Sequence, residues 1–301
     1  MIFVAQGVAR TVGALVLLCA AVTHSFAGTT LDRIKQDGIV HVGYDDGLPF
    51  SYKTAKDASP AGYSIDICLA LVESLRHEYK LKSLDVRFVP VTSDNHVAQI
   101  VDGKVDLVCA GVTNTKERRE KVAFSLPMYY ASAKLLVREG SGIKRVDDLD
   151  GKTLAVLKGT TGERIAETRR SGMPGLKLLR VESDEDGLKA VASQAADAYI
   201  DDDIALYGLK AKSSERLAVV GSALSIEPLA LMFSKIDREL GNFVHREMGQ
   251  LYKTGQIRKL YSKWFQSPLP QLSFNLNVVP NQLTADMFNN PSAYATDWTV
   301  F

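Results

Sequence analysis

The chain alternates short apolar runs with amphipathic segments, and it does so twice along its length. The strand-like runs of the first half are 39–43, 86–91 and 105–110, and those of the second half are 153–157, 177–182 and 197–201. Between these runs lie segments whose apolar residues recur at helical spacing. Strands that alternate with helices form mostly parallel sheets covered by helices. The pattern therefore predicts an α/β protein built from two such units.

Two long extended runs, Tyr129 to Val137 and Ile226 to Phe233, join the units. Each can carry the chain from one unit to the other. We therefore expect a first lobe formed by 28–131 and 226–301 and a second lobe formed by 132–225. A cleft between the lobes would hold the ligand, because ligands of such sheets bind at the carboxyl ends of the strands.

Residues 1–27 have the features of a secretory signal peptide. Arg10 is their only charged residue, Thr11 to Val22 is apolar, and Ser25-Phe-Ala27 is a small-x-small cleavage site. The apolar run is short for a membrane span, so an uncleaved anchor is the less favoured alternative. We expect an exported mature protein that begins after Ala27.

Charge is balanced over the whole chain, with 36 Lys and Arg against 35 Asp and Glu. No basic face therefore suggests a nucleic-acid partner. Cys68 and Cys109 remain after cleavage of the signal peptide, and their spacing fits no metal motif. A disulfide and two buried free thiols both remain open. We expect no metal and no cofactor.

The stretch from Gly111 to Arg118 follows an apolar strand and carries residues that suit an anion. Thr113 or Asn114 can cap a helix whose first turn holds Arg118. The N–H groups at a helix start attract anions, and the planar guanidinium of an arginine matches a carboxylate. The alternative is a surface loop with a solvated Arg118.

Other polar residues follow predicted strands in the same way. Gly159-Thr-Thr161 can form a second anion site, in which Thr160 and Thr161 begin a helix. Asp202 can pair with an ammonium group, whereas the alternative is a helix cap. Asp45 and Ser93 also lie at strand ends. Phe50 and Tyr52 offer flat surfaces that either pack on a ligand or fill the core.

These motifs together resemble the periplasmic solute-binding proteins of polar amino acid ABC importers, and most of all their glutamate/aspartate-binding branch. The resemblance runs from Leu31 to Pro270. It is carried by Pro49-Phe-Ser-Tyr52, Gly62-Tyr-Ser-Ile-Asp66, Thr92-Ser-Asp-Asn95, Thr113-Asn-Thr-Lys-Glu-Arg118, Asp148-Leu-Asp-Gly-Lys152, Gly159-Thr-Thr161 and Asp202-Asp203. It implies a type II periplasmic binding protein fold and a monomer in the periplasm. Its partners would be an amino acid and an inner-membrane ABC permease.

The resemblance also implies roles for individual residues. Arg118 would hold the ligand α-carboxylate with the help of Thr113 and Thr161. Asp202 would pair with the α-ammonium group, assisted by the Gly111 carbonyl. Phe50 and Tyr52 would form walls of the pocket, and Ser93 would lie near the side chain of the ligand.

The chain departs from the glutamate/aspartate branch where that branch has basic residues. It has Asp45 and Asp46 in place of an arginine, His96 in place of another, and Asp184 near the usual position of a histidine; Gly111 replaces a serine. Of the residues at these positions, only His96 could still supply a positive charge. Carboxylates in a desolvated site disfavour a dicarboxylate ligand. A neutral polar or cationic amino acid, or a derivative, is therefore an alternative to glutamate or aspartate. In a further alternative, the Asp side chains face solvent and a dicarboxylate still binds through Ser93, His96 and backbone groups.

Two other function classes remain to be compared with transport. An exported, dehydratase-like enzyme on this frame would need a general acid or base, for which His96 or Asp184 could serve. A ligand sensor would have to act through a separate membrane chain. No paired nucleophile and base is visible in the sequence, so we expect a binding protein rather than an enzyme.

Overall fold

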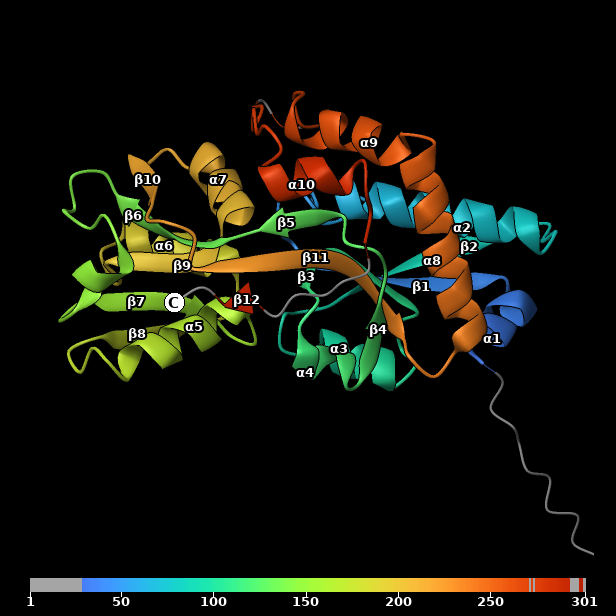
Figure 1. Ribbon diagram of the computed structural model, residues 1–301, viewed down its shortest axis with the longest axis horizontal. Helices are drawn as coiled ribbons and strands as arrows, with labels where there is room; N and C mark the ends of the chain where they lie inside the picture. Colours follow the sequence, from blue (N-terminus) through green and yellow to red (C-terminus); the bar gives the residue numbers. More distant parts are fainter. Residues whose placement is uncertain (1–28, 271, 273, 293–297, 300–301) are drawn as a thin grey trace, which may run out of the picture.

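The computed structural model describes residues 29–299, apart from 271, 273 and 293–297. The predicted signal peptide, 1–27, lies outside the described residues. The fold consists of two mixed β-sheets that are flanked by helices and lie side by side (Figure 1). This arrangement confirms the prediction of a two-lobed α/β protein. Within the described ranges, no helix is long and apolar enough to cross a membrane.

The first lobe is built on a seven-stranded sheet with the order β12-β11-β3-β1-β2, in which β4 and β5 also pair with β11. Its strands are β1 (Ile39–Tyr44), β2 (Asp85–Pro90), β3 (Leu107–Thr113), β4 (Val122–Phe124), β5 (Tyr129–Ala131), β11 (Ser225–Ser234) and β12 (Trp298–Thr299). Its helices are α1 (Thr30–Asp37), α2 (Tyr63–Glu78), α3 (His96–Val101), α4 (Lys116–Arg119), α8 (Arg238–Lys253), α9 (Gln256–Phe265) and α10 (Gln282–Met287).

The second lobe is built on a five-stranded sheet with the order β10-β6-β9-β7-β8. Its strands are β6 (Ala133–Arg138), β7 (Thr153–Leu157), β8 (Lys177–Val181), β9 (Ala198–Asp202) and β10 (Leu217–Val220). Its helices are α5 (Thr161–Arg170), α6 (Asp184–Ala192) and α7 (Asp203–Lys212), with a 3-10 turn, η1, at Val146–Leu149.

Parallel pairing places the carboxyl ends of these strands at one edge of each sheet. In the first lobe β1 pairs in parallel with β2 and with β3, and in the second lobe β7 does so with β8 and with β9. The segments that follow these strands therefore meet between the lobes. The chain passes from the first sheet to the second between β5 and β6, and returns between β10 and β11.

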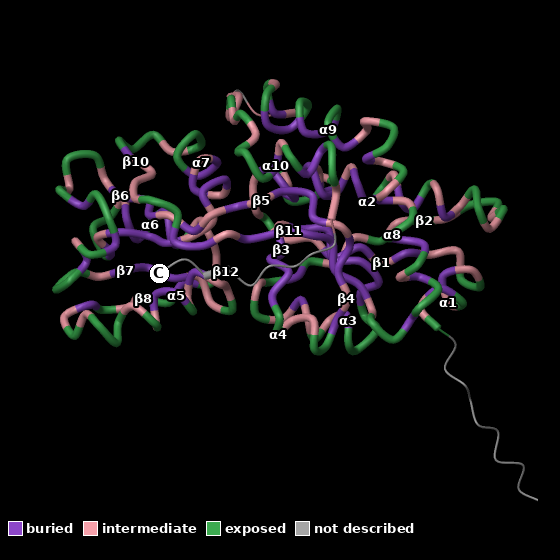
Figure 2. Tube along the Cα trace, viewed as in Figure 1, coloured by how far each residue is buried: buried purple, intermediate pink, exposed green. Residues whose placement is uncertain are grey.

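Both sheets are buried on their inner faces, whereas the outer faces of the helices are exposed (Figure 2). The core of the first lobe includes a stack of aromatic rings. The rings of Tyr261 and Phe265 lie parallel, with centroids 4.2 Å apart, and the Tyr129 ring lies parallel to both. Burying a large apolar side chain contributes about 1.5–3 kcal/mol, so this cluster ties α9 firmly to β5.

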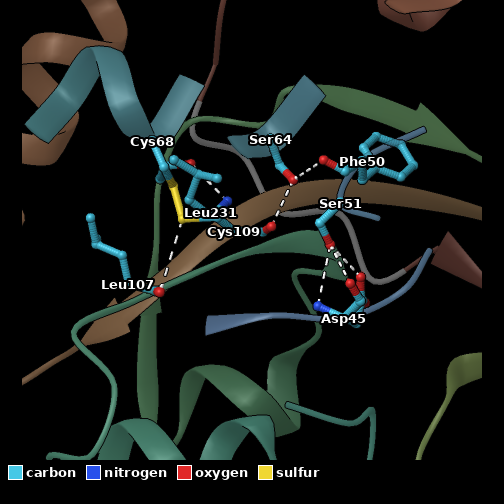
Figure 3. The surroundings of a disulfide bond; sticks show 9 residues. Asp45, Phe50, Ser51, Ser64, Cys68, Leu107, Cys109 and Leu231 are labelled. Atoms are coloured by element: carbon cyan, nitrogen blue, oxygen red, sulfur yellow. Dashed lines mark hydrogen bonds between the residues drawn. A yellow bond between two sulfur atoms is a disulfide. The ribbon is translucent and has the colours of Figure 1, made fainter. Parts of the chain in front are cut away.

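Cys68 and Cys109 form a disulfide that joins α2 to β3 (Figure 3). The question that the sequence leaves open is thus decided in favour of a bridge, which suits an oxidising compartment. Four residues before Cys68, the Ser64 hydroxyl lies 2.7 Å from the Phe50 carbonyl oxygen and 2.8 Å from that of Cys109. The bridge therefore holds α2 directly behind the loop that follows β1.

Candidate ligand-binding cleft

A cavity of about 70 Å³ lies where the strand ends of the two lobes meet. Its lining combines residues from segments far apart in the chain. They are Asp45, Gly47, Leu48, Phe50, Ser93, His96, Gly111, Val112, Thr113, Arg118, Leu157, Thr160, Thr161, Asp184, Asp201, Asp202 and Ala205. All but one of the predicted site residues are among them, and the exception is Tyr52.

Arg118 reaches the cavity from the short helix α4. Thr115, rather than Thr113 or Asn114, is the N-cap, and its hydroxyl accepts a hydrogen bond of 3.3 Å from the Arg118 N–H. The predicted cap was wrong because Thr113 stays in β3, where it pairs with Leu229 of β11. Arg118 is still in the first turn, as predicted.

The guanidinium of Arg118 spans the two lobes. Its Nη1 donates to the Thr113 carbonyl at 2.8 Å, and its Nη2 donates to the Gly159 carbonyl at 3.0 Å. Burial lowers the pKa of Arg118, while the nearby carboxylates of Glu227 and Asp202 oppose that change. An arginine remains charged under such conditions. The cavity wall therefore carries a fixed cation that is suited to a carboxylate.

Glu227 is a site residue that the sequence analysis missed. It lies in β11 and is only 2% exposed. Its Oε2 accepts hydrogen bonds from the hydroxyls of Thr113 (2.7 Å) and Thr161 (2.6 Å), and its Oε1 accepts one from Ser225 (2.6 Å). The sequence did contain a sign of this role, because Glu227 is a charged residue inside an apolar extended run. A charged side chain is buried at low cost only when it is paired or hydrogen-bonded.

Thr160 and Thr161 have different functions in the turn that begins α5. The Thr160 hydroxyl caps the helix by accepting from the Glu163 N–H at 3.2 Å, and it donates to the Leu157 carbonyl at 2.7 Å. The Thr161 hydroxyl instead points to Glu227. Gly159 is needed here: it has φ +75°, and a Cβ on it would lie 2.7 Å from the Asp94 Cα of the other lobe.

Asp202 occupies the N-cap position of α7, but its side chain makes no capping hydrogen bond. Its Oδ1 is buried and has no hydrogen-bond partner within the described part of the chain. Burial, and then repulsion from Glu227, raise the pKa of Asp202 well above its ordinary value. The helix-cap alternative is therefore wrong, and a buried acceptor faces the cavity.

Asp45 and Asp184 line the cavity from opposite lobes rather than facing solvent. The Asp45 carboxylate accepts from the Ser51 hydroxyl at 2.5 Å and from the Gly47 N–H at 3.2 Å. Burial, together with the charge of Asp184, raises the pKa of Asp45 to about 6. Both carboxylates thus belong to the environment of any ligand in the cavity.

His96 and Ser93 line the same cavity near the start of α3. His96 is 5% exposed. Burial, and then the charge of Arg118, lower its pKa to about 3, so the imidazole is neutral at physiological pH. The expectation that His96 could supply a positive charge was therefore wrong.

Of the two predicted aromatic walls, only Phe50 reaches the inner cavity. A Cβ on Gly111 would lie 2.8 Å from the Phe50 ring, so the glycine leaves room for that ring against β3. Tyr52 pairs with Ala61, donates to the Pro270 carbonyl at 3.1 Å and packs on the Trp264 ring. It lines a second, outer cavity instead.

The described residues hold no group of three or more His, Cys, Asp or Glu side chains that could bind a metal ion. The lining residues make the candidate site a mixed polar cleft with one guanidinium and several carboxyl groups.

Comparison with known proteins shows which protein family this chain matches. Residues 40–267 match the bacterial extracellular solute-binding proteins, family 3. The chain belongs to this family. This solute-binding protein is 32% identical over 285 residues to the L-glutamate/L-aspartate-binding protein of Pseudomonas aeruginosa. The alignment covers 93% of this chain and 94% of the relative.

Solved structures agree with that assignment. A mutant of ArgBP from T. maritima superposes with a TM-score of 0.70 at 29% identity, covering 79% of this chain and 100% of that one. The ancestral amino acid-binding protein AncCDT-1, described as a precursor of cyclohexadienyl dehydratase, gives a TM-score of 0.67 at 36% identity, covering 79% and 99%.

Proposed function

We propose that this solute-binding protein captures an amino acid in the cleft and delivers it to an inner-membrane ABC permease. One observation carries the proposal: the fixed guanidinium of Arg118 lines the same cavity as Asp202, whose buried Oδ1 has no hydrogen-bond partner among the described residues. These two groups complement the α-carboxylate and the α-ammonium of an amino acid. The match to the extracellular solute-binding family and the amino-acid-binding relative of P. aeruginosa support this proposal.

In this proposal the ligand carboxylate binds to Arg118 and to the hydroxyls of Thr113 and Thr161. Those hydroxyls, which donate to Glu227 in the structure, would turn toward the ligand. The ammonium binds to Asp202 and the Gly111 carbonyl. Phe50 and Ser93 contact the ligand side chain.

The lobes, 28–131 with 226–301 and 132–225, would close around the ligand by bending where the chain crosses between the sheets. The protein would act as a monomer in the periplasm after removal of residues 1–27. These assignments rest on the resemblance and on the position of the crossings.

An enzymatic role is the second candidate, because one structural relative is named as a precursor of a dehydratase. We favour transport, because the matching family and the P. aeruginosa relative are described as binding proteins. Turnover of a cyclic acid by the purified protein would favour the enzyme instead.

A melting-temperature screen tests the proposal. The purified protein is mixed with each common L-amino acid and with analogues that lack the α-amino or the α-carboxyl group. A ligand that binds only the folded state raises the melting temperature by mass action. We expect a rise with at least one amino acid and a much smaller rise with both of its analogues. An equal rise with either analogue would contradict the assigned roles of Arg118 and Asp202.

A further inference from the structure

The inner cavity is lined by more carboxyl groups than basic groups. Its lining includes four carboxyl groups, on Asp45, Asp184, Asp201 and Asp202. Arg118 is the only Lys or Arg among the lining residues that the structure describes. When the ligand carboxylate occupies Arg118 and the ligand ammonium occupies Asp202, three carboxyl groups remain without a matching cation.

These three carboxyl groups come from both lobes. Asp45 follows β1 in the first lobe, Asp184 begins α6 in the second, and Asp201 lies in β9. The Tyr199 hydroxyl lies 2.7 Å from Asp184 Oδ1 and 2.6 Å from Asp201 Oδ2. A hydroxyl has a single proton to donate, so it cannot satisfy both carboxylates. The cluster therefore retains accepting capacity that faces the cavity.

The outer cavity, of about 390 Å³, lies next to this cluster. The two cavities share six lining residues, which are Asp45, Gly47, Leu48, Ser93, Leu157 and Asp184. Asp45 and Asp184 thus stand at the junction between them. An elongated ligand whose α-groups lie at Arg118 and Asp202 would extend its side chain between these two carboxylates.

We propose that the ligand is an amino acid with a cationic side chain, an ammonium or a guanidinium, held between Asp45 and Asp184. This inference rests on the proposed amino-acid-binding function and specifies its substrate class. A glutamate or aspartate ligand would instead place its second carboxylate against the acidic cluster, where like charges in a desolvated site repel strongly.

The positions of Asp45 and Asp184 on different lobes also make closure of the lobes depend on the charge of the ligand. Asp45 and Asp184 belong to different lobes, so their repulsion opposes any motion that brings these two carboxylates together. A cation between them removes that repulsion and gains from both charges. The ligand therefore stabilises the closed form through its side chain as well as through its α-groups.

Titration calorimetry on the mature protein, freed of co-purified ligand by unfolding and refolding, tests the proposal. The probes are L-lysine, L-arginine and L-ornithine, compared with L-glutamate, L-aspartate and L-glutamine. We expect a cationic amino acid to bind at least about tenfold more tightly than glutamine, a difference of ~1.4 kcal/mol. Tighter binding of glutamate or aspartate would overturn the inference but leave the amino-acid-binding function standing. Binding of none of the six, with no rise in the wider screen, would overturn the function itself.

Variants separate the acidic cluster from the rest of the site. Asp184→Asn and Asp45→Asn should each weaken the cationic ligand about tenfold or more, and should weaken it more than they weaken glutamine. Asp186→Asn is the matched control, because Asp186 lies on the same helix, is 49% exposed and lines neither cavity. Unchanged binding of the cationic ligand by both Asp184→Asn and Asp45→Asn would overturn the proposal.

Discussion

The hydroxyl of Thr161, in the second lobe, donates a 2.6 Å hydrogen bond to the carboxylate of Glu227, in β11, the first-lobe strand that follows the return crossing. Thr113 of the first lobe donates to the same oxygen. One buried carboxylate therefore connects both lobes. Hydrogen bonds to a charged group contribute about 1.5–3 kcal/mol each, so this contact weighs on the balance between open and closed forms.

Replacing Glu227 with glutamine should shift the ligand-free protein toward the open form. The amide oxygen can accept on one side only, so either Ser225 or the two threonine hydroxyls lose their acceptor. Small-angle scattering of the ligand-free variant should give a larger radius of gyration than that of the wild type. Glu185→Gln, which affects an ion pair with Lys212 inside the second lobe, is the control. An unchanged scattering profile for Glu227→Gln would mean that Glu227 does not hold the lobes together.

Arg118→Lys should weaken amino acid binding roughly 100-fold or more, because it removes the two-pronged donor and about 1.5–3 kcal/mol for each charged hydrogen bond. The measurement is a calorimetric titration with the best ligand of the screen. Arg119→Lys makes the same change one residue further on, at a side chain that donates to Asn114 and lies outside the cavity, and should bind normally. Equal affinities of the two variants would argue against Arg118 as the carboxylate site.

Gly159→Ala should reduce ligand affinity by preventing closure. The added Cβ would lie 2.7 Å from Asp94 Cα and 2.8 Å from the Ser93 carbonyl oxygen, which are both backbone atoms of the opposite lobe. Gly142→Ala is matched in backbone strain, since Gly142 has φ +80° and open space around it. Both variants should lose similar stability, but only Gly159→Ala should lose affinity in a titration. Equal affinity losses would assign the effect to backbone strain.

Removing the disulfide should lower stability without changing the site's chemistry. The bridge spans a sequence separation of 41. For a loop of that length, the chain-entropy model gives a contribution of about 4 kcal/mol. The double variant Cys68→Ala with Cys109→Ala should therefore unfold at lower denaturant concentration than the oxidised wild type. Its ligand affinity should be nearly unchanged, and a large loss of affinity would show that the bridge also positions the Asp45–Phe50 loop.

Binding of a cationic amino acid should strengthen as pH rises through about 6. Burial and the charges of Asp184 and Asp46 raise the pKa of Asp45 from 3.8 to about 6, against the opposing hydrogen bonds from Ser51 and Gly47. A raised carboxyl pKa means that the folded state favours the proton, so stability from this group is lost as pH rises from about 4 to about 6. A cationic ligand favours the ionised form of Asp45, so its binding offsets the stability that the folded state loses when Asp45 ionises.

Titrations with L-lysine at several pH values between about 5 and about 8 provide the measurement. Asp45→Asn should flatten the pH dependence, because it removes the titrating group. A pH dependence that persists unchanged in Asp45→Asn would assign it to another group.

The local pattern of the chain was enough to predict much of the architecture. The alternation of strands and helices depends on side-chain periodicity, which is a property of neighbouring residues, and both parallel units followed from it. Arg118 and Asp202 were likewise found by their positions after strands, because parallel strands end at one edge of a sheet.

Contacts between distant segments decided the rest. The sequence could not distinguish a disulfide from two thiols, because the distance between Cys68 and Cys109 depends on how α2 packs on β3. His96 loses its charge only because burial and Arg118 surround it.

Glu227 shows the same division most clearly. In the sequence it is a single acidic residue in an extended run, and its partners lie at separations of 114 and 66 residues. Its role appears only when both lobes bring their threonine hydroxyls to one carboxylate. The sequence by itself determined the two α/β units and the strand ends that carry polar groups. Tertiary structure decided which of those groups meet and which are charged, because desolvation and pairing depend on what surrounds each group in space.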